Sequence, residues 1–183
     1  NVPFALKLSA ESPEQIKRAD LYTWIETEVK EIYNSLAAPA ARNSSQEGYG
    51  RADQDAANML LARLYLNAEV YTGTAHWAEA KEYAEKVING PHKLFTDQSA
   101  GYDPSCGYTP YQMLFMGDNG ETGAATESIL SILQDGVTSA AYGCTLFIMA
   151  ATWKNDMNED GDYGSSEFWA GVLSRSHLVK KFF

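Results

Sequence analysis

The apolar residues between residues 51 and 90 recur at the spacing of two consecutive helices. In the first helix they return every three or four positions and so share one face: Ala57, Leu60, Leu61, Leu64, Ala68 and Tyr71. In the second helix the same face is formed by Trp77, Ala80, Ala84, Val87 and Ile88. Asp53 and Thr74 are predicted to cap the N-termini of the two helices. Gly73 is predicted to end the first helix and Gly90 the second, which gives a helical hairpin.

The segment before the hairpin carries the signature of another helix start. Ser12 occupies the position of an N-cap, Pro13 the first helical position, and Gln15 the position that completes a capping box. A long helix is therefore predicted from this point, with residues 1–10 extended before it. Its apolar face is formed by Ile16, Trp24, Ile25, Val29, Ile32, Tyr33 and Leu36.

Beyond Pro91 the helical period is lost and glycine, tyrosine and aspartate become frequent. The short apolar run Ser128–Leu133 is compatible with a buried strand or a brief helix, and periodicity does not decide between them. The predicted fold class is mainly α, with tetratricopeptide-like helical hairpins, of the kind that form an α–α superhelix, and a large irregular loop region. Within a single domain spanning 1–183, residues 12–91 form the helical core and residues 92–183 the loop-rich region, where function is expected.

Composition narrows the classes of protein. Of the 183 residues, 45% are hydrophobic and 21% charged, which is typical of a folded domain with a core. The formal net charge of −10 and the absence of a Lys/Arg cluster argue against a nucleic-acid partner or an anionic membrane surface. No apolar run is long enough to span a bilayer. Cys106 and Cys144 form no CxxC pair and are compatible with one disulfide or with two thiols.

Motifs for catalysis are weak. The sequence has no GxSxG, no HExxH and no glycine-rich phosphate loop before a helix. His76, His92 and His177 lie in separate segments, where structural or surface roles are the commoner ones. Four carboxylates of the loop region are candidates for a glycosidase pair, but the distance between them does not follow from the sequence: Asp118, Glu121, Glu127 and Asp135. The sequence therefore predicts no enzyme.

The sharpest local motif is DMNEDGDYGSSE, residues 156–167, which matches the calcium loop of an EF-hand. The expected oxygen ligands are Asp156, Asn158, Asp160 and Glu167, with a glycine at the turn. Two features depart from the motif: a tyrosine stands at the eighth position, where an aliphatic residue is usual, and a glycine soon interrupts the exit helix. Two interpretations remain, a calcium site and a solvated acidic loop.

Aromatic side chains gather in the last third of the chain, several of them on glycine-flanked loops: Tyr142, Trp153, Tyr163, Phe168 and Trp169. Sugar rings present apolar C–H faces surrounded by hydroxyls, and flat aromatic side chains bind them by stacking while a few polar groups fix their orientation. For any single ring, packing against the helices is the commoner role. The group as a whole indicates a sugar site better than any of its members.

Four segments resemble, in the same order, the SusD/RagB family of glycan-binding lipoproteins. Together they cover nearly the whole chain: RADLYTWIETEVKEI (18–32), YGRADQDAANMLLARLYLNAEVYTGTAHWAEAKEYAEKVI (49–88), FMGDNGETGAATESILSILQDG (115–136) and FWAGVLSRSHLVKKFF (168–183). Several motifs in one order make the resemblance specific. Full-length members are much longer, so the chain is expected to be a central part, without the lipid-bearing N-terminus and the C-terminal region.

The resemblance implies a helical protein whose tetratricopeptide-like units support irregular loops. Family members are lipoproteins on the outer face of the Gram-negative outer membrane, and they are not enzymes. They bind oligosaccharides and hand them to a SusC-like TonB-dependent transporter, so contact with the membrane is expected only through the lipid anchor. No cofactor is required. Some members bind calcium, and Asp118 of the GDN segment is a candidate match to one of their ligands.

In starch-binding members, loop aromatics form an arc that holds the glycan. The positions here that match best are Tyr142, after QDG, and Trp169, in the W-x-G segment, with Trp153 as a third. Arg175 is added because Leu173 stands where an arginine usually follows W-x-G. The leading hypothesis is non-catalytic glycan binding at the cell surface for delivery to the transporter. The alternative is a tetratricopeptide-type protein-interaction scaffold without a sugar site, which burial of all three aromatics would favour.

Overall fold

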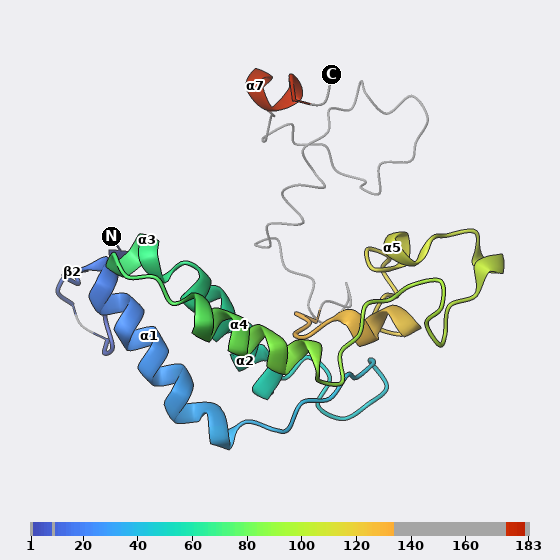
Figure 1. The fold of residues 1–183 in the computed structure, drawn as a ribbon, viewed down its shortest axis with the longest axis horizontal. Helices are drawn as coiled ribbons and strands as arrows, with labels where there is room; N and C mark the ends of the chain where they lie inside the picture. Colours follow the sequence, from blue (N-terminus) through green and yellow to red (C-terminus); the bar gives the residue numbers. More distant parts are fainter. Residues whose placement is uncertain (1, 9, 134–174, 182–183) are drawn as a thin grey trace. The chain divides into compact units, whose positions relative to one another are not determined.

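The computed structural model of the chain describes residues 2–8, 10–133 and 175–181 (Figure 1). The chain divides into two units, residues 1–132 and 133–183. In the described part of the second unit, the short helix α7 (Ser176–Val179) is followed by a turn. The architecture of the first unit is helical, which confirms the mainly α part of the predicted fold class; its tetratricopeptide-like character stays a prediction. No helix among the described residues combines the length and the apolar character needed to cross a membrane.

The helical hairpin is formed by α2 (Gln54–Leu66) and α4 (Trp77–Ile88), which pack along one another (Figure 1). Asp53 caps α2 as predicted, because its side chain accepts hydrogen bonds from the free amides of Asp55 and Ala56. Helix α2 ends at Leu66, and after Asn67 the short helix α3 (Ala68–Thr72) follows it. Gly73 ends α3 in the left-handed region, with φ of 84°, as predicted.

The predicted cap of the second hairpin helix is wrong. Helix α4 begins at Trp77, and its N-cap residue His76 makes no side-chain capping hydrogen bond. The hydroxyl of Thr72 accepts from the Thr74 amide at 3.1 Å and donates to the Ala68 carbonyl at 2.9 Å. These bonds fold residues 72–74 into a turn, so Thr74 belongs to the end of the first helical stretch and not to the start of the second.

The capping box predicted at Ser12 is also wrong. Helix α1 (Arg18–Ile32) starts later, and the 3₁₀ turn η1 (Tyr33–Ser35) follows it. The reason is that β2 (Gln15–Ile16) pairs antiparallel with β1 (Val2–Pro3), so the backbone of Gln15 is already in a strand. A capping box does form elsewhere, between Thr109 and Gln112 on the short helix α5 (Pro110–Met113).

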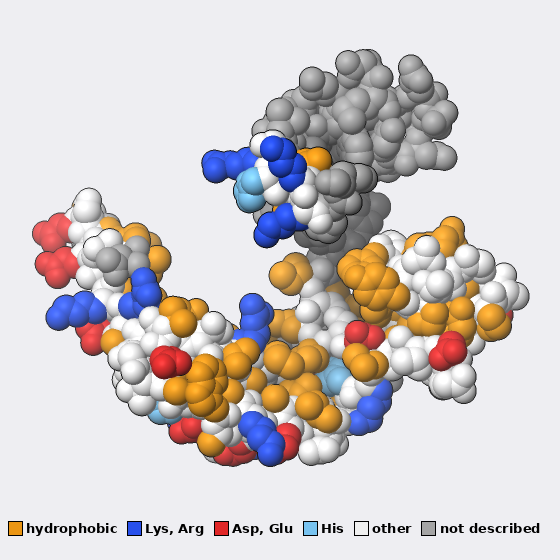
Figure 2. Space-filling model, turned by 45° about the horizontal axis from the view of Figure 1, so that its top comes forward, with side chains coloured by type: hydrophobic (Ala, Val, Ile, Leu, Met, Phe, Trp, Pro, Cys, Tyr) orange, Lys and Arg blue, Asp and Glu red, His pale blue; other side chains and the backbone are white. Residues whose placement is uncertain are grey.

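The core of the first unit is formed by residues of α1, α2, α3 and α4. Its buried members are Tyr22, Val29, Ala57, Leu61, Leu64, Tyr65, Ala68 and Ala80. Most predicted stripe positions are in this core or at its edge, and the small side chains among them let the helices approach closely. Five stripe positions are exposed instead: Ile32, Leu60, Tyr71, Trp77 and Ile88. Figure 2 shows one face of the molecule, on which exposed apolar side chains alternate with charges of both signs.

Residues 92–132 are irregular, as predicted, and contain only α5 and the 3₁₀ turns η2 (Pro104–Cys106) and η3 (Gly123–Glu127). Their own small core contains Phe95, Ala124 and Ala125. The Phe95 amide donates to the carboxylate of Glu127 at 2.7 Å, which joins two distant parts of the segment. The apolar run that follows η3 is neither strand nor helix, and its side chains Leu130, Ile132 and Leu133 are exposed.

Candidate functional site

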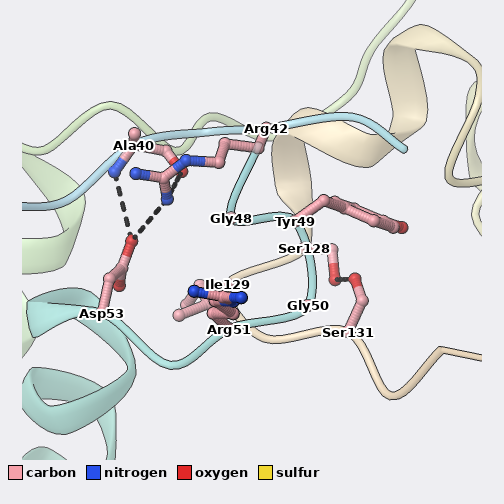
Figure 3. A pocket seen from close by; sticks show the side chains of 10 residues that line it. All are labelled: Ala40, Arg42, Gly48, Tyr49, Gly50, Arg51, Asp53, Ser128, Ile129 and Ser131. Atoms are coloured by element: carbon pink, nitrogen blue, oxygen red, sulfur yellow. Dashed lines mark hydrogen bonds and ion pairs between the residues drawn. The ribbon is translucent and has the colours of Figure 1, made fainter. Parts of the chain in front are cut away.

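A small polar hollow lies in the first unit, where the loop that leads into α2 meets the segment after η3 (Figure 3). One wall is formed by residues of the segment 40–53, and the other by Ser128, Ile129 and Ser131. Guanidinium, carboxylate and hydroxyl groups line it, together with the ring of Tyr49. The lining contains no histidine and no cysteine.

Asp53 fixes the first wall. Its carboxylate is almost fully buried and accepts hydrogen bonds with both oxygens: Oδ1 from the Asp55 and Ala56 amides, Oδ2 from the Ala40 amide and from Arg42 Nη1. The last two contacts are 3.2 and 3.4 Å long (Figure 3). The residue that starts α2 therefore also holds the preceding loop in place and neutralises the charge of Arg42.

Tight backbone turns position Tyr49 in the first wall of the hollow. Gly48 and Gly50 flank it in left-handed conformations, with φ of 83° and 75°, which glycine adopts without steric cost. The phenol oxygen of Tyr49 lies close over Gly120, where a Cβ atom would come within 2.5 Å of it. Across the hollow, the hydroxyls of Ser128 and Ser131 are 2.8 Å apart.

Arg51 is the group in the lining whose charge is not compensated among the described residues. Its side chain is exposed and lies beside Ile129 (Figure 3), and it makes no ion pair with any described carboxylate. A guanidinium and neighbouring hydroxyls are suited to hydrogen-bonding a polar group. The hollow therefore offers polar contacts from the Arg51 guanidinium and the hydroxyls of Ser128 and Ser131.

The predicted glycan-binding aromatics Tyr142, Trp153 and Trp169 lie outside the described residues. Arg175 is described: it is exposed and stands immediately before α7, where its side chain makes no capping hydrogen bond. These four positions therefore remain predictions. The hollow at Asp53 contains none of them.

The four predicted calcium ligands, Asp156, Asn158, Asp160 and Glu167, also lie outside the described residues. Within the part of the chain that the structure describes, no three His, Cys, Asp or Glu side chains converge on a common point. Asp118, the family-based candidate, is exposed in a turn, where its carbonyl accepts from the Glu121 amide at 2.8 Å.

One carboxylate that was a candidate for a glycosidase pair has a structural contact. Glu127 accepts the hydrogen bond of the Phe95 amide and thereby holds the irregular segment together. Of the other three candidates for such a pair, Asp118 and Glu121 are exposed in the turn before Glu127, and Asp135 lies outside the described residues. Cys106 is exposed, and Cys144 lies outside the described residues.

Sequence reasoning missed a cluster of buried polar side chains: Asp55, Asn58 and His92. The period of the first hairpin helix marked only its apolar positions, and two polar residues within its first two turns are ordinary on a solvated face. His92 follows Pro91 in a segment without period, so nothing in the sequence placed it beside α2. The one signal in the sequence was that a polar residue of this helix stands at a position that faces the neighbouring helix.

A hydrogen-bonded group of charged and polar side chains joins α1 to α2. Glu26 accepts hydrogen bonds from Tyr65 Oη at 2.6 Å and from Lys30 Nζ at 2.5 Å. Burial acts to raise the pKa of Glu26, but the bonds from Lys30 and Tyr65 outweigh it and hold that pKa below its usual value. Burial, aided by the bond to Glu26, raises the pKa of Tyr65, so the phenol stays protonated as a donor.

The comparison with known proteins gives a relative of established identity. The chain is 38% identical over 182 residues to the starch-binding protein SusD of Bacteroides thetaiotaomicron. The match covers 99% of this chain and 29% of SusD, so the chain spans less than a third of the length of this relative. No protein-family model matches the chain. The identity extends along essentially the whole sequence, including the hairpin and the hollow at Asp53, and the chain therefore belongs to the SusD-like family.

Proposed function

We propose that the protein containing this chain binds starch or a related polysaccharide at the cell surface and does not cleave it. The observation that carries the proposal is the 38% identity to a starch-binding protein over 99% of the chain. One feature of the sequence supports it: several aromatic residues lie in the loop-rich part of the chain.

The proposed sugar contacts are Tyr142, Trp153 and Trp169, with Arg175 as a polar partner. Stacking of a pyranose ring on an indole or phenol buries apolar C–H surface, and a guanidinium can then hydrogen-bond the sugar hydroxyls. In this proposal the helical hairpin, which we propose is of the tetratricopeptide type, supports the loops, and the loops bind the sugar.

We further propose that the protein acts with a SusC-like TonB-dependent transporter, to which it passes the bound glycan. The expected location is the extracellular face of the outer membrane, reached through a lipid anchor on another part of the full-length protein. The formal charge of −10 gives the chain no electrostatic attraction to an anionic lipid surface, so the anchor would have to supply the attachment.

The experiment is a profile of the full-length protein against immobilised polysaccharides, with starch among α- and β-linked glucans and non-glucan controls. Retention on starch or a related glycan, with no reducing ends released over hours, is the expected result. Retention on no polysaccharide would contradict the proposal and favour the protein-interaction scaffold. Release of soluble sugar from the bound polysaccharide would contradict its non-catalytic part.

A further inference from the structure

A buried polar junction connects the helical hairpin to the irregular segment, at a place separate from the proposed sugar contacts. Three side chains form it: Asp55 and Asn58 on α2, and His92 just beyond the end of α4. Each is more than nine-tenths buried. Asn58 Nδ2 donates to Asp55 Oδ1 at 3.1 Å, while Asp55 Oδ2 and His92 Nε2 have no hydrogen-bond partner among the described residues.

The buried carboxylate of Asp55 lies in the first turn of α2 and faces the end of α4. A Cβ atom added to Gly90 would lie 2.9 Å from Asp55 Oδ2 and 3.1 Å from the Val87 carbonyl oxygen, so this oxygen is close to the last carbonyls of α4. The C-terminal end of a helix carries partial negative charge. A buried carboxylate at such a place requires a cation or strong donors nearby.

His92 is placed to supply that cation. Its Nε2 lies 3.9 Å from Asp55 Oδ2, and its Nδ1 lies 3.3 Å from the carbonyl oxygen of Thr126. Both neighbours are hydrogen-bond acceptors, and a neutral imidazole carries a proton on only one of its two nitrogens. The imidazolium form, with a proton on each nitrogen, can donate to the Thr126 carbonyl and at the same time form an ion pair with Asp55.

The other charged groups around the ring do not replace this interaction. The carboxylate of Glu127, next to Thr126, accepts from the Phe95 amide. The ammonium of Lys93, next to His92, donates to the Ile88 carbonyl at 3.2 Å and so caps the end of α4. Asp55 is therefore the carboxylate that faces the ring of His92 within ion-pair distance among the described residues.

We propose that His92 is a positioning residue, held as an imidazolium between Asp55 and Thr126, which fixes segment 123–131 to the helical hairpin. The Lys93 amide donates to the same Thr126 carbonyl at 3.4 Å, so the junction continues along the backbone. Thr126 precedes Ser128 and Ser131 of the hollow, and Asp55 belongs to the first turn of the helix that Asp53 caps. The junction thus sets the distance between the two walls of the hollow, whether or not the glycan proposal holds.

The test combines a spectroscopic measurement with a mutant cycle on the full-length protein. Nitrogen-15 spectra of the histidine rings at neutral pH report whether each nitrogen carries a proton. The expected result is that both nitrogens of His92 are protonated in the wild type and that one loses its proton in Asp55→Asn. A neutral His92 ring in the wild type would overturn the proposal, even if no variant folds.

In the mutant cycle, Asp55→Asn and His92→Gln are each expected to lower the equilibrium ratio of folded to unfolded protein roughly a hundredfold. The reason is that each substitution leaves one buried charge without its partner. The double variant, which removes both charges, is expected to lose much less than the product of the two effects. Simple multiplication of the two losses would contradict the pairing. His177→Gln, at an exposed histidine of α7, is the control and should change nothing.

Amide hydrogen exchange separates positioning from a general loss of stability. In His92→Gln, protection should fall at the amides of Lys93 and Phe95, which bond to Thr126 and Glu127. Protection should remain at amides within α2, such as that of Leu61, when the variant and the wild type are compared under conditions where the variant is folded. An equal loss of protection throughout the first unit would overturn the assigned role.

Discussion

The phenol of Tyr65 on α2 donates a hydrogen bond of 2.6 Å to Glu26 on α1. Removing it by Tyr65→Phe should cost about 1 kcal/mol at pH 7, the usual net value for a lost hydrogen bond at a partly exposed site. The pKa of Glu26 is lowered in the folded protein, so its stabilising contribution exists above its unfolded-state pKa and disappears as pH falls through the folded one. Urea unfolding should therefore show a difference between variant and wild type at pH 7 that shrinks towards pH 3. A difference that grows on acidification would contradict this account.

Two adjacent leucines on α2 have opposite environments. Leu61 has no exposed surface, whereas Leu60 is 48% exposed. Leu61→Ala should lower the free energy of unfolding by about 2–5 kcal/mol, because it opens a cavity between the helices. Leu60→Ala is the matched control and should cost under about 1 kcal/mol. Chemical denaturation of the two variants measures both values, and equal losses would show that the register of the hairpin is wrong.

Gly90 is required by close packing at the end of α4. A methyl group there would lie 2.9 Å from the buried Asp55 carboxylate and about as close to two backbone carbonyls. Gly90→Ala should therefore destabilise the protein by about 1–3 kcal/mol. Gly117 has no atom within 4 Å of the equivalent position, and Gly117→Ala should be neutral or slightly stabilising. Thermal unfolding of both variants tests the prediction, which fails if Gly90→Ala melts at the wild-type temperature.

The acidic loop 156–167 is predicted to bind calcium through Asp156, Asn158, Asp160 and Glu167. Titration of the full-length protein with calcium should release or absorb heat, and a hundredfold excess over the dissociation constant should stabilise it by about 2.7 kcal/mol. Glu167→Gln should abolish the effect, while Glu28→Gln at an exposed position of α1 should not. Absence of both heat and a change in melting temperature would leave the solvated-loop interpretation.

The accuracy of the sequence predictions follows the physical range of the interactions involved. The cap at Asp53 and the end at Gly73 were correct because each depends on one residue and the helix beside it. The cap at Ser12 failed because pairing with Val2 and Pro3 keeps Gln15 in a strand, which no local pattern reports. The contact between Asp55 and His92 joins residues far apart in sequence and has no periodic signature. The predicted sugar and calcium positions remain predictions.

Loop aromatics of this chain are proposed to bind a glycan. Titration calorimetry of the full-length protein with a soluble starch oligosaccharide measures this binding. Trp169→Ala should weaken binding about 10- to 100-fold, since it removes the apolar surface on which a sugar ring stacks. Trp77→Ala, at a half-exposed tryptophan of α4, should bind as the wild type does. Equal affinity of Trp169→Ala and the wild type, or no binding by the wild type, would contradict the account.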